Sequence, residues 1–132
     1  MPSMVPRMTK RVLIADDDED MRELLRMALS SAMYTVVGAA ADGDEALDMW
    51  RREKDQGVCV VILDQRMPGL FGIDVATEIR TDNPDQPVVL LSAYLDQATQ
   101  DRARDVGIAA CIPKEDVLFV PNHPVLLGAC SD

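Results

Sequence analysis

Basic side chains are scarce in this sequence, and their scarcity limits what the chain can bind. Its 132 residues include 13 Lys and Arg against 23 Asp and Glu, for a formal net charge of −10 at pH 7. Proteins that bind nucleic acid present basic stripes to the phosphates, so we expect no direct contact between this chain and nucleic acid. A solvated acidic surface is the ordinary explanation of such an excess.

Long apolar runs are also missing. No stretch approaches the ~20 apolar residues that a membrane-spanning helix needs, so we expect no membrane contact. Residues 1–10 lack the apolar core of a signal peptide, and we predict that they form a short disordered lead. Residues 11–132 have the length of one domain with a single core, and an apolar content of 48% is typical of a globular protein.

Cysteine is rare and shows no pattern. The three cysteines, Cys59, Cys111 and Cys130, form an odd set without the spacing of a metal site. Cys59 and Cys111 lie inside apolar runs, where a thiol packs as a small hydrophobic side chain. A reducing compartment, the cytoplasm, is therefore the expected location.

Short apolar runs alternate with segments of helical periodicity along the chain. Strands are predicted at 12–15, 34–37, 58–64, 88–91 and 108–112, and helices at 21–32, 42–56, 72–81, 96–106 and 122–129. This alternation indicates an α/β fold, a doubly wound five-stranded parallel sheet with right-handed crossovers. We predict the flavodoxin-like strand order 2-1-3-4-5, because it brings acidic residues together. Pro121 and Pro124 should make the last helix short and atypical.

Acidic residues directly follow the first and third predicted strands. Asp16, Asp17 and Asp18 follow the first, and Asp64 closes the third. In the predicted order these strand ends are neighbours, so Asp16, Asp17 and Asp64 should meet. Carboxylates so close repel one another unless a proton or a cation neutralises them. A small set of oxygen ligands suits Mg²⁺, which keeps several waters and accepts a phosphate oxygen.

Other meanings of the acidic cluster can be tested on the sequence. A calcium-binding loop starting at Asp16 would need Gly and Glu where the chain has Met21 and Met27. A haloacid-dehalogenase-type phosphatase would resemble Asp-x-Asp-x-Thr or Val, but the fifth position is Asp20. An acid-rich helix start, with Asp18 as its N-cap, explains the cluster without any ligand and stays open.

Two more polar side chains reach the same edge of the predicted sheet. Ser92 follows the fourth strand and Lys114 follows the fifth. Each alone is an ordinary surface residue, but acids, a hydroxyl and an amine on four strand ends form a set. The set resembles the receiver domains of response regulators in two-component signalling, which are CheY-like. The resemblance covers roughly residues 11–114 and depends on Asp16-Asp17, Asp64, Met67-Pro68, Gly72, Ser92-Ala93 and Lys114.

The resemblance implies a phosphoryl switch rather than an enzyme acting on other molecules. Asp64 would accept a phosphoryl group from a sensor histidine kinase or a phosphotransfer protein, and the chain would catalyse only its own phosphorylation and dephosphorylation. Mg²⁺ would be held by Asp16, Asp17, Asp64 and the backbone carbonyl of Arg66.

The same resemblance implies roles for two further residues. Lys114 would neutralise phosphoryl oxygens, and Ser92 would hydrogen-bond one of them. Ser92 would then pull in the loop before the helix at 96–106. The face formed by that helix, the strand at 108–112 and the last helix would change shape and bind partners.

The sequence departs from the family pattern near the site. Cys111 stands three residues before the lysine, where the family generally has Tyr or Phe as a switch, so relay through that position is in doubt. Tyr94 is a candidate substitute. Glu115 follows Lys114 where the family has Pro, which leaves the isomer of that peptide bond open. We expect Arg66 and Tyr94, each two residues beyond a site residue, to hinder water and slow loss of the phosphoryl group.

Two alternative functions and the oligomeric state stay open. A pseudo-receiver would use the same fold as a constitutive protein-interaction module, and a Mg²⁺-dependent phosphatase would turn over external phosphoesters. The apolar last helix could pack on the sheet or support a homodimer. We assign no catalytic role to His123, the single histidine. No output domain is visible, so the chain is either a stand-alone regulator or part of a longer one.

Overall fold

The computed structural model describes residues 10–130. The predicted disordered lead thus lies outside the described residues, apart from Lys10. The elements are β1 (Arg11–Ala15), α1 (Glu19–Ser31), β2 (Thr35–Ala40), α2 (Gly43–Glu53), the 3₁₀ segment η1 (Lys54–Gln56), β3 (Val60–Asp64), α3 (Gly72–Asp82), β4 (Val88–Ser92), α4 (Gln97–Asp105), β5 (Ala110–Pro113), the 3₁₀ segment η2 (Lys114–Asn122) and α5 (Pro124–Ala129).

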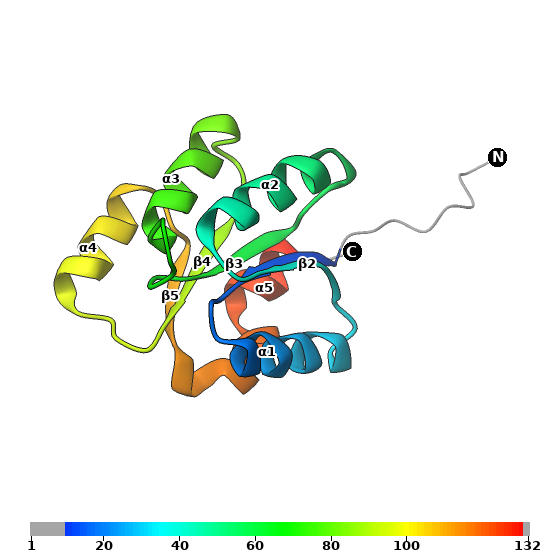
Figure 1. Cartoon of the computed structure of the whole chain (residues 1–132). Coiled ribbons are helices and arrows are strands. Elements are labelled where there is room, and N and C mark those ends of the chain that lie inside the picture. The colour runs from blue at the N-terminus through cyan, green and yellow to red at the C-terminus, as the bar shows by residue number, and fades with distance from the viewer. Residues whose placement is uncertain (1–9, 131–132) are drawn as a thin grey trace.

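The five strands form one parallel sheet in the order β2-β1-β3-β4-β5, which confirms the predicted topology (Figure 1). Helices α1 and α5 cover one face of the sheet, and α2, α3 and α4 cover the other. Alternate residues of the central strands enter the two cores, because side chains on a strand point to opposite faces. In β3, Val61 and Leu63 join the core under α2 and α3, while Ile62 joins the core under α1 and α5.

The strand boundaries differ from the prediction by about two residues at β2, β3 and β5. The expected end of β2 at Gly38 is wrong, since the strand continues to Ala40. A Cβ atom at Gly38 would lie 2.7 Å from Leu13 Cδ1, so this glycine allows a close approach between neighbouring strands. The pairing of β1 and β2 also shifts register just before Leu13.

Aspartates cap three of the helices. Asp18 accepts a hydrogen bond from the backbone N–H of Asp20 at 2.9 Å, which confirms it as the N-cap of α1. Asp42 accepts from Glu45 N at 2.8 Å, but the Glu45 carboxylate accepts from Ala41 N, one residue outside a standard capping box. Asp96 caps α4, and the hydrogen bonds donated by Thr99 lower the pKa of the Asp96 carboxyl.

Residues 114–130, called the C-terminal segment from here on, differ most from the prediction. The helix expected from 122 starts at Pro124, and the 3₁₀ segment η2 before it was not anticipated. Leu126 is fully buried, so α5 does pack on the sheet, whereas Leu127 is 55% exposed. The Tyr34 hydroxyl donates to the carbonyl of Pro121 at 3.0 Å and ties η2 to the start of β2.

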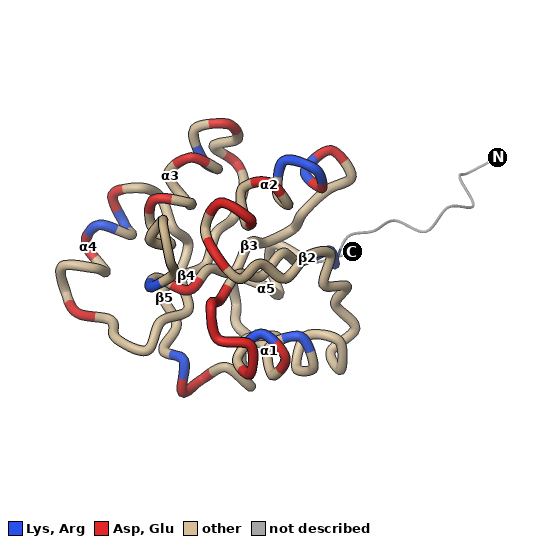
Figure 2. Tube along the Cα trace, viewed as in Figure 1, with Lys and Arg blue, Asp and Glu red and all other residues tan. Residues whose placement is uncertain are grey.

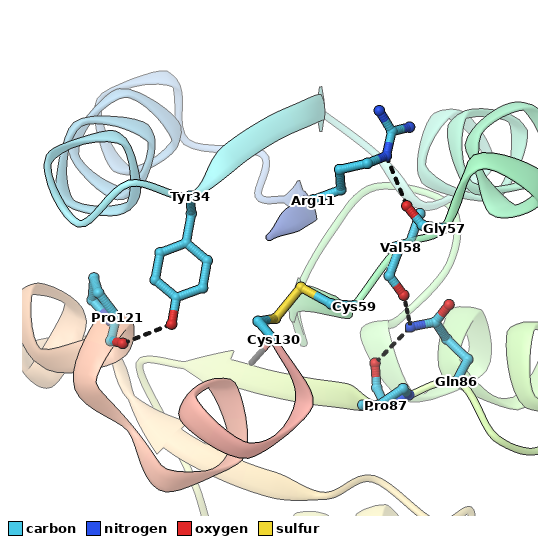
Figure 3. Close-up of a disulfide and its surroundings, with 9 residues drawn as sticks. All are labelled: Arg11, Tyr34, Gly57, Val58, Cys59, Gln86, Pro87, Pro121 and Cys130. Carbon is cyan, nitrogen blue, oxygen red and sulfur yellow. Dashed lines mark hydrogen bonds between the residues drawn. A yellow bond between two sulfur atoms is a disulfide. The ribbon is translucent and has the colours of Figure 1, made fainter. Parts of the chain in front are cut away.

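A disulfide joins Cys59 to Cys130 across 71 residues of sequence (Figure 3). The expectation that Cys59 packs as a free thiol is therefore wrong, and Cys111 is the free cysteine. The physical reason is a contact between distant parts of the chain: the turn into β3 and the end of α5 meet in space. The spacing of the cysteines in the sequence does not indicate this contact. The bond connects the C-terminal segment to the amino end of β3, whereas Asp64 lies at the carboxyl end of the same strand.

Within residues 10–130, no helix is both long enough and apolar enough to cross a membrane.

Candidate functional site

Three carboxylates meet at the carboxyl ends of β1 and β3. Oxygen atoms of Asp16, Asp17 and Asp64 all lie within 4.8 Å of one another. Asp16 and Asp64 are buried, with 2% and 4% of their surface exposed, whereas Asp17 is exposed. Acidic residues concentrate where β1 leads into α1 (Figure 2). The strand order thus produces the convergence that the sequence predicted.

Hydrogen bonds and an ion pair with neighbouring residues fix the position of Asp16. Its Oδ1 accepts a hydrogen bond from Asp18 N at 2.9 Å, and its backbone carbonyl accepts from the Arg22 guanidinium at 2.8 Å. The buried Oδ2 atom lies 2.8 Å from the Lys114 ammonium, in an ion pair, and has no other partner among the residues that the structure describes. A buried acceptor in this state can take a cation as a further partner.

Lys114 follows β5 and points across β4 into the acidic cluster. Its Nζ atom lies 2.8 Å from Asp16 Oδ2 and 3.1 Å from Asp64 Oδ2. Burial alone would lower the pKa of the Lys114 ammonium, but the hydrogen bonds and charges of Asp16 and Asp64 outweigh burial and raise it. Lys114 therefore stays charged and neutralises part of the acidic cluster.

Asp64 has a perturbed titration. Burial, followed by the negative charge of Asp16, raises the pKa of the Asp64 carboxyl to about 6, against the opposing effects of Lys114 and the backbone N–H of Arg66. One lysine thus leaves the negative charge of the cluster incompletely neutralised. A second cation at this point would lower the pKa of Asp64 and complete the neutralisation.

Gln65, which sequence reasoning missed, fixes the loop that follows Asp64. Its side chain is buried and accepts a hydrogen bond from Ile73 N at 2.9 Å, and its carbonyl accepts from Gly72 N at 2.9 Å. A Cβ atom at Gly72 would lie 2.4 Å from the Asp64 carbonyl oxygen. The turn through Pro68 therefore brings the start of α3 against the backbone of Asp64, and only glycine fits there.

Ser92 lies at the rim of the same site, at the end of β4. It is 3% exposed, and its hydroxyl donates to the carbonyl of Tyr94 at 3.2 Å. Tyr94 is 63% exposed. A cavity of about 610 Å³ is lined by Asp17, Asp18, Asp64, Arg66, Ser92, Ala93, Tyr94 and Lys114. The predicted site residues therefore line one cavity, except for Asp16 behind Lys114 and Cys111 on β5.

Cys111 lies half-buried on β5 and packs against the core beneath α4. Burial raises the pKa of its thiol, so the group is a poor nucleophile at neutral pH. The Lys114–Glu115 peptide bond, whose isomer the sequence left open, is trans, as are all peptide bonds of the described residues. Among the other predictions, α4 is weakly anchored as expected, with Ala103 as its buried residue.

His123 lies apart from the acidic cluster and has a structural role. Its Nδ1 atom accepts a hydrogen bond from Val125 N at 3.1 Å and caps α5. Capping of α5 is therefore a sufficient structural role for His123, and no catalytic role is needed.

The acidic cluster fits a magnesium ion. It offers three carboxylates, one of them exposed, beside a cavity with room for water. Mg²⁺ binds through one or two carboxylates and keeps several waters, unlike Ca²⁺, which takes six to eight oxygen ligands. The raised pKa of Asp64, which Lys114 does not offset, indicates a place where a further cation would be stabilised.

Comparisons with known proteins identify the same family. The family model described as response regulator receiver domain matches residues 12–117. The chain is 39% identical over 110 residues to the transcriptional regulatory protein PdtaR of Mycobacterium tuberculosis, covering 83% of this chain and 50% of that protein. It is 41% identical over 120 residues to the probable transcriptional regulator ycf27 of Guillardia theta, covering 91% and 43%. The chain thus spans about half the length of these curated relatives.

Solved structures agree with this assignment. The receiver domain of the response regulator NarL from Mycobacterium tuberculosis superposes with a TM-score of 0.81 at 33% identity, covering 92% of this chain and 97% of that one. The chemotaxis protein CheY4 of Vibrio cholerae gives a TM-score of 0.75 at 27% identity, covering 89% and 92%. The chain belongs to the response regulator receiver domain family of two-component signalling.

Proposed function

We propose that this receiver domain is a phosphorylatable switch in which Asp64 accepts a phosphoryl group. The observation that carries the proposal is the surroundings of Asp64: the Lys114 ammonium lies 3.1 Å from its carboxylate, and Asp16 and Asp17 lie close enough to hold a cation together with it. The donor is a phosphohistidine of a sensor histidine kinase or phosphotransfer protein, the partners that serve this family. The chain acts on itself and turns over no external substrate.

The transfer is a displacement at phosphorus. An Oδ atom of Asp64 attacks, the bond from phosphorus to the histidine nitrogen breaks, and the histidine leaves as a neutral imidazole after taking up a proton. Asp16, Asp17, Asp64 and the backbone carbonyl of Arg66 would hold Mg²⁺. When bound there, the ion would supply positive charge to the phosphoryl oxygens. The family binds magnesium at such an acidic pocket.

Lys114 and Ser92 complete the binding of the phosphoryl group. Lys114 already contacts Asp64, so its ammonium can pair with a phosphoryl oxygen after a small movement. The Ser92 hydroxyl now donates within its own loop to Tyr94 and would turn to the phosphoryl oxygen instead. That exchange would pull the loop before α4 inward, and α4 can follow because few buried contacts hold it in place. The surface of α4, β5 and α5 then changes and binds the next partner.

Arg66, Tyr94 and Cys111 modulate the switch. Arg66 and Tyr94 line the cavity at its mouth, where they shield the acyl phosphate from water. Cys111 is too small to report the position of Ser92 by swinging inward, so the relay depends more on Tyr94. If the relay has been lost, the chain is a pseudo-receiver that binds partners constitutively; Cys111 is the observation that favours this second candidate.

The remaining proposals concern the whole protein. Residues 11–132 form the receiver domain, which works in the cytoplasm, where its kinase partners present their phosphohistidine. The chain makes no direct contact with nucleic acid, given its charge of −10. The exposed Leu127 of α5 is available for a homodimer.

Phosphorylation by a small donor tests the proposal. Incubation with Mg²⁺ and acetyl phosphate should add the mass of one phosphoryl group to the intact protein. Asp64→Asn should remain unmodified, whereas Asp55→Asn, which changes an exposed carboxyl on η1, should be modified like the wild type. No mass increase in the wild type would contradict the switch and favour the pseudo-receiver.

A further inference from the structure

The disulfide joins two parts of the chain that have different stability of their own. Cys59 directly precedes β3, the central strand, and its backbone N–H donates to Arg11 O at 2.9 Å. Cys130 ends the C-terminal segment (Figure 3). The two Cα atoms lie 5.2 Å apart, within the range that a disulfide spans without moving the backbone. The bond therefore ties the residue that follows α5 to the start of the central strand β3.

The C-terminal segment has little regular structure to hold it in place. Its first part is a 3₁₀ segment with a non-helical residue at Asp116, and Pro121 removes a backbone donor. Its second part, α5, has six residues, well below the length at which a helix is stable by itself. Docking thus depends on a few buried side chains, namely Val117, Val120 and Leu126, on the Tyr34 hydrogen bond and on the disulfide.

The two cysteines differ in burial. As residues, Cys130 is 1% exposed and Cys59 is half-buried, so we take Cys59 as the cysteine that an attacking thiolate meets first. Reducing compartments keep most thiols reduced, and a disulfide there is usually transient and regulatory. Receiver domains act beside their kinases in such a compartment under the function proposed above. We therefore expect this disulfide to form and break reversibly, in addition to its structural role.

We infer that Cys59 and Cys130 form a reversible redox site that locks and releases the C-terminal segment, and that a dithiol reductant operates it. A thiolate of the reductant attacks Sγ of Cys59, the Cys59–Cys130 bond breaks, and Cys130 leaves as a thiolate that takes up a proton. The second thiol of the reductant then attacks the mixed disulfide and frees Cys59. Two electrons pass to the protein, and the reductant becomes a disulfide. A low-molecular-weight disulfide such as oxidised glutathione reverses the reaction by the same exchange.

Release of the segment affects the phosphorylation site at its other end. Lys114 is the first residue of η2, and its ammonium pairs with Asp16 and Asp64. While the disulfide holds Cys130, η2 stays packed against α1 and the Lys114 ammonium stays within contact of Asp16 and Asp64. When the tether is cut, Lys114 occupies that position less of the time. This consequence and the reducing compartment rest on the proposed function; the disulfide and its position on the C-terminal segment do not.

The redox site is tested without any phosphodonor. The protein is oxidised with oxidised glutathione or reduced with a dithiol at neutral pH without denaturant, thiols are trapped with a maleimide, and the mass is measured. The oxidised protein should take up one label, at Cys111, and the reduced protein three. A Cys111→Ser variant should take up none and two. A disulfide that fails to form, or that opens only in denaturant, would overturn the inference.

Release is measured by hydrogen exchange on the same two samples. Amides of residues 114–130 should exchange about 10-fold or more faster after reduction, while those of β3 and β4 change little. Cys130→Ser should exchange like the reduced wild type under both conditions; the wild-type comparison still decides the matter if that variant folds poorly. Equal exchange of the segment in both states would overturn the lock.

The link to phosphorylation has its own readout. The rate of modification by acetyl phosphate should fall several-fold on reduction of the wild type and be insensitive to redox state in Cys130→Ser. If the protein is never phosphorylated but the exchange difference persists, the proposed function fails and the redox lock stands. If phosphorylation proceeds at one rate in both redox states, the coupling to Lys114 is wrong.

Discussion

The Nζ atom of Lys114 lies 3.1 Å from Oδ2 of Asp64, although Asp64 ends β3, Lys114 follows β5, and β4 lies between these strands. The same ammonium lies 2.8 Å from Asp16. One long side chain thus reaches across the sheet edge and counters two buried carboxylates. A positive charge next to the Asp64 carboxylate suits a reaction in which a negatively charged phosphoryl group is added to that carboxylate.

Loss of the Lys114 ammonium should slow phosphorylation. Lys114→Met keeps the aliphatic length and removes the charge, and we expect modification by acetyl phosphate to slow about 10²-fold. The rate of intact-mass increase measures the effect. Lys54→Met is the matched control, since Lys54 lies on η1 over the Trp50 ring, and its rate should equal that of the wild type. An unchanged rate for Lys114→Met would refute the role of this lysine.

Asp64→Asn should stabilise the metal-free protein at neutral pH. The pKa of Asp64 rises from 3.8 to about 6 on folding, so the folded state binds the proton more tightly than the unfolded chain. The stability contributed by Asp64 is fully present below pH 4 and is lost as the pH rises through 6. Removing the charge should then add about 1–3 kcal/mol at pH 8 and almost nothing at pH 3.5.

Urea unfolding in EDTA at both pH values measures this difference. Asp55→Asn serves as a control, because it removes an exposed carboxyl on η1. An equal effect of Asp64→Asn at both pH values would show that Asp64 is not perturbed.

Mg²⁺ should stabilise the folded protein, because it binds the assembled carboxylates and not the unfolded chain. At a concentration 100 times the Kd the free energy of unfolding should rise by about 2.7 kcal/mol. Asp17→Asn should reduce the stabilisation by Mg²⁺. This variant is the easiest to interpret, because Asp17 is exposed and its replacement disturbs no packing. Thermal unfolding with and without Mg²⁺ reports the shift, and a full shift in Asp17→Asn would exclude this carboxylate as a ligand.

Gly72→Ala should destabilise the domain and distort the site. The added methyl group would lie 2.4 Å from the carbonyl oxygen of Asp64, so the backbone must move, at a cost of about 1–3 kcal/mol. Gly128→Ala is the matched control. A Cβ atom there meets nothing within 4 Å, and alanine in α5 should add up to about 1 kcal/mol. Denaturant unfolding compares the two; a neutral Gly72→Ala would contradict the close approach.

Opening the disulfide should lower stability. Cys130→Ala removes the covalent link across 71 residues, and we expect a loss of about 2–4 kcal/mol relative to the oxidised wild type. Cys111→Ala removes a half-buried thiol without touching the link and should cost less. Unfolding of oxidised samples in urea measures both. Equal losses would mean that the link adds nothing beyond packing.

Most of the fold was predictable because its signals are local. The apolar run before Asp64 and the proline and glycine that follow it mark a buried strand and its turn within a dozen residues. Alternating strands imply a parallel sheet, and the strand order that we chose because it brings the acidic residues together places the carboxyl ends of β1 and β3, with Asp16, Asp17 and Asp64, side by side. Ser92 and Lys114 followed by the same logic.

The remaining features depend on contacts between distant parts of the chain. Cys59 and Cys130 read as ordinary residues until the end of α5 is placed beside the start of β3. Gln65 resembles any polar residue after a strand until its side chain is found to hold Ile73 N. The segment η2 packs beside α1 and contains Pro121, and no periodicity in the sequence predicts its 3₁₀ form. Local patterns indicate which elements form, but not which atoms they bring together.

The central claim is that Asp64 is the phosphoacceptor, and the most direct test is to locate the modification. After phosphorylation with Mg²⁺ and acetyl phosphate, borohydride reduces an aspartyl phosphate to homoserine, which peptide mass spectrometry assigns to one residue. We predict homoserine at position 64 alone. Homoserine at position 16, 17 or 18, or none in a protein that gained phosphoryl mass, would contradict the account.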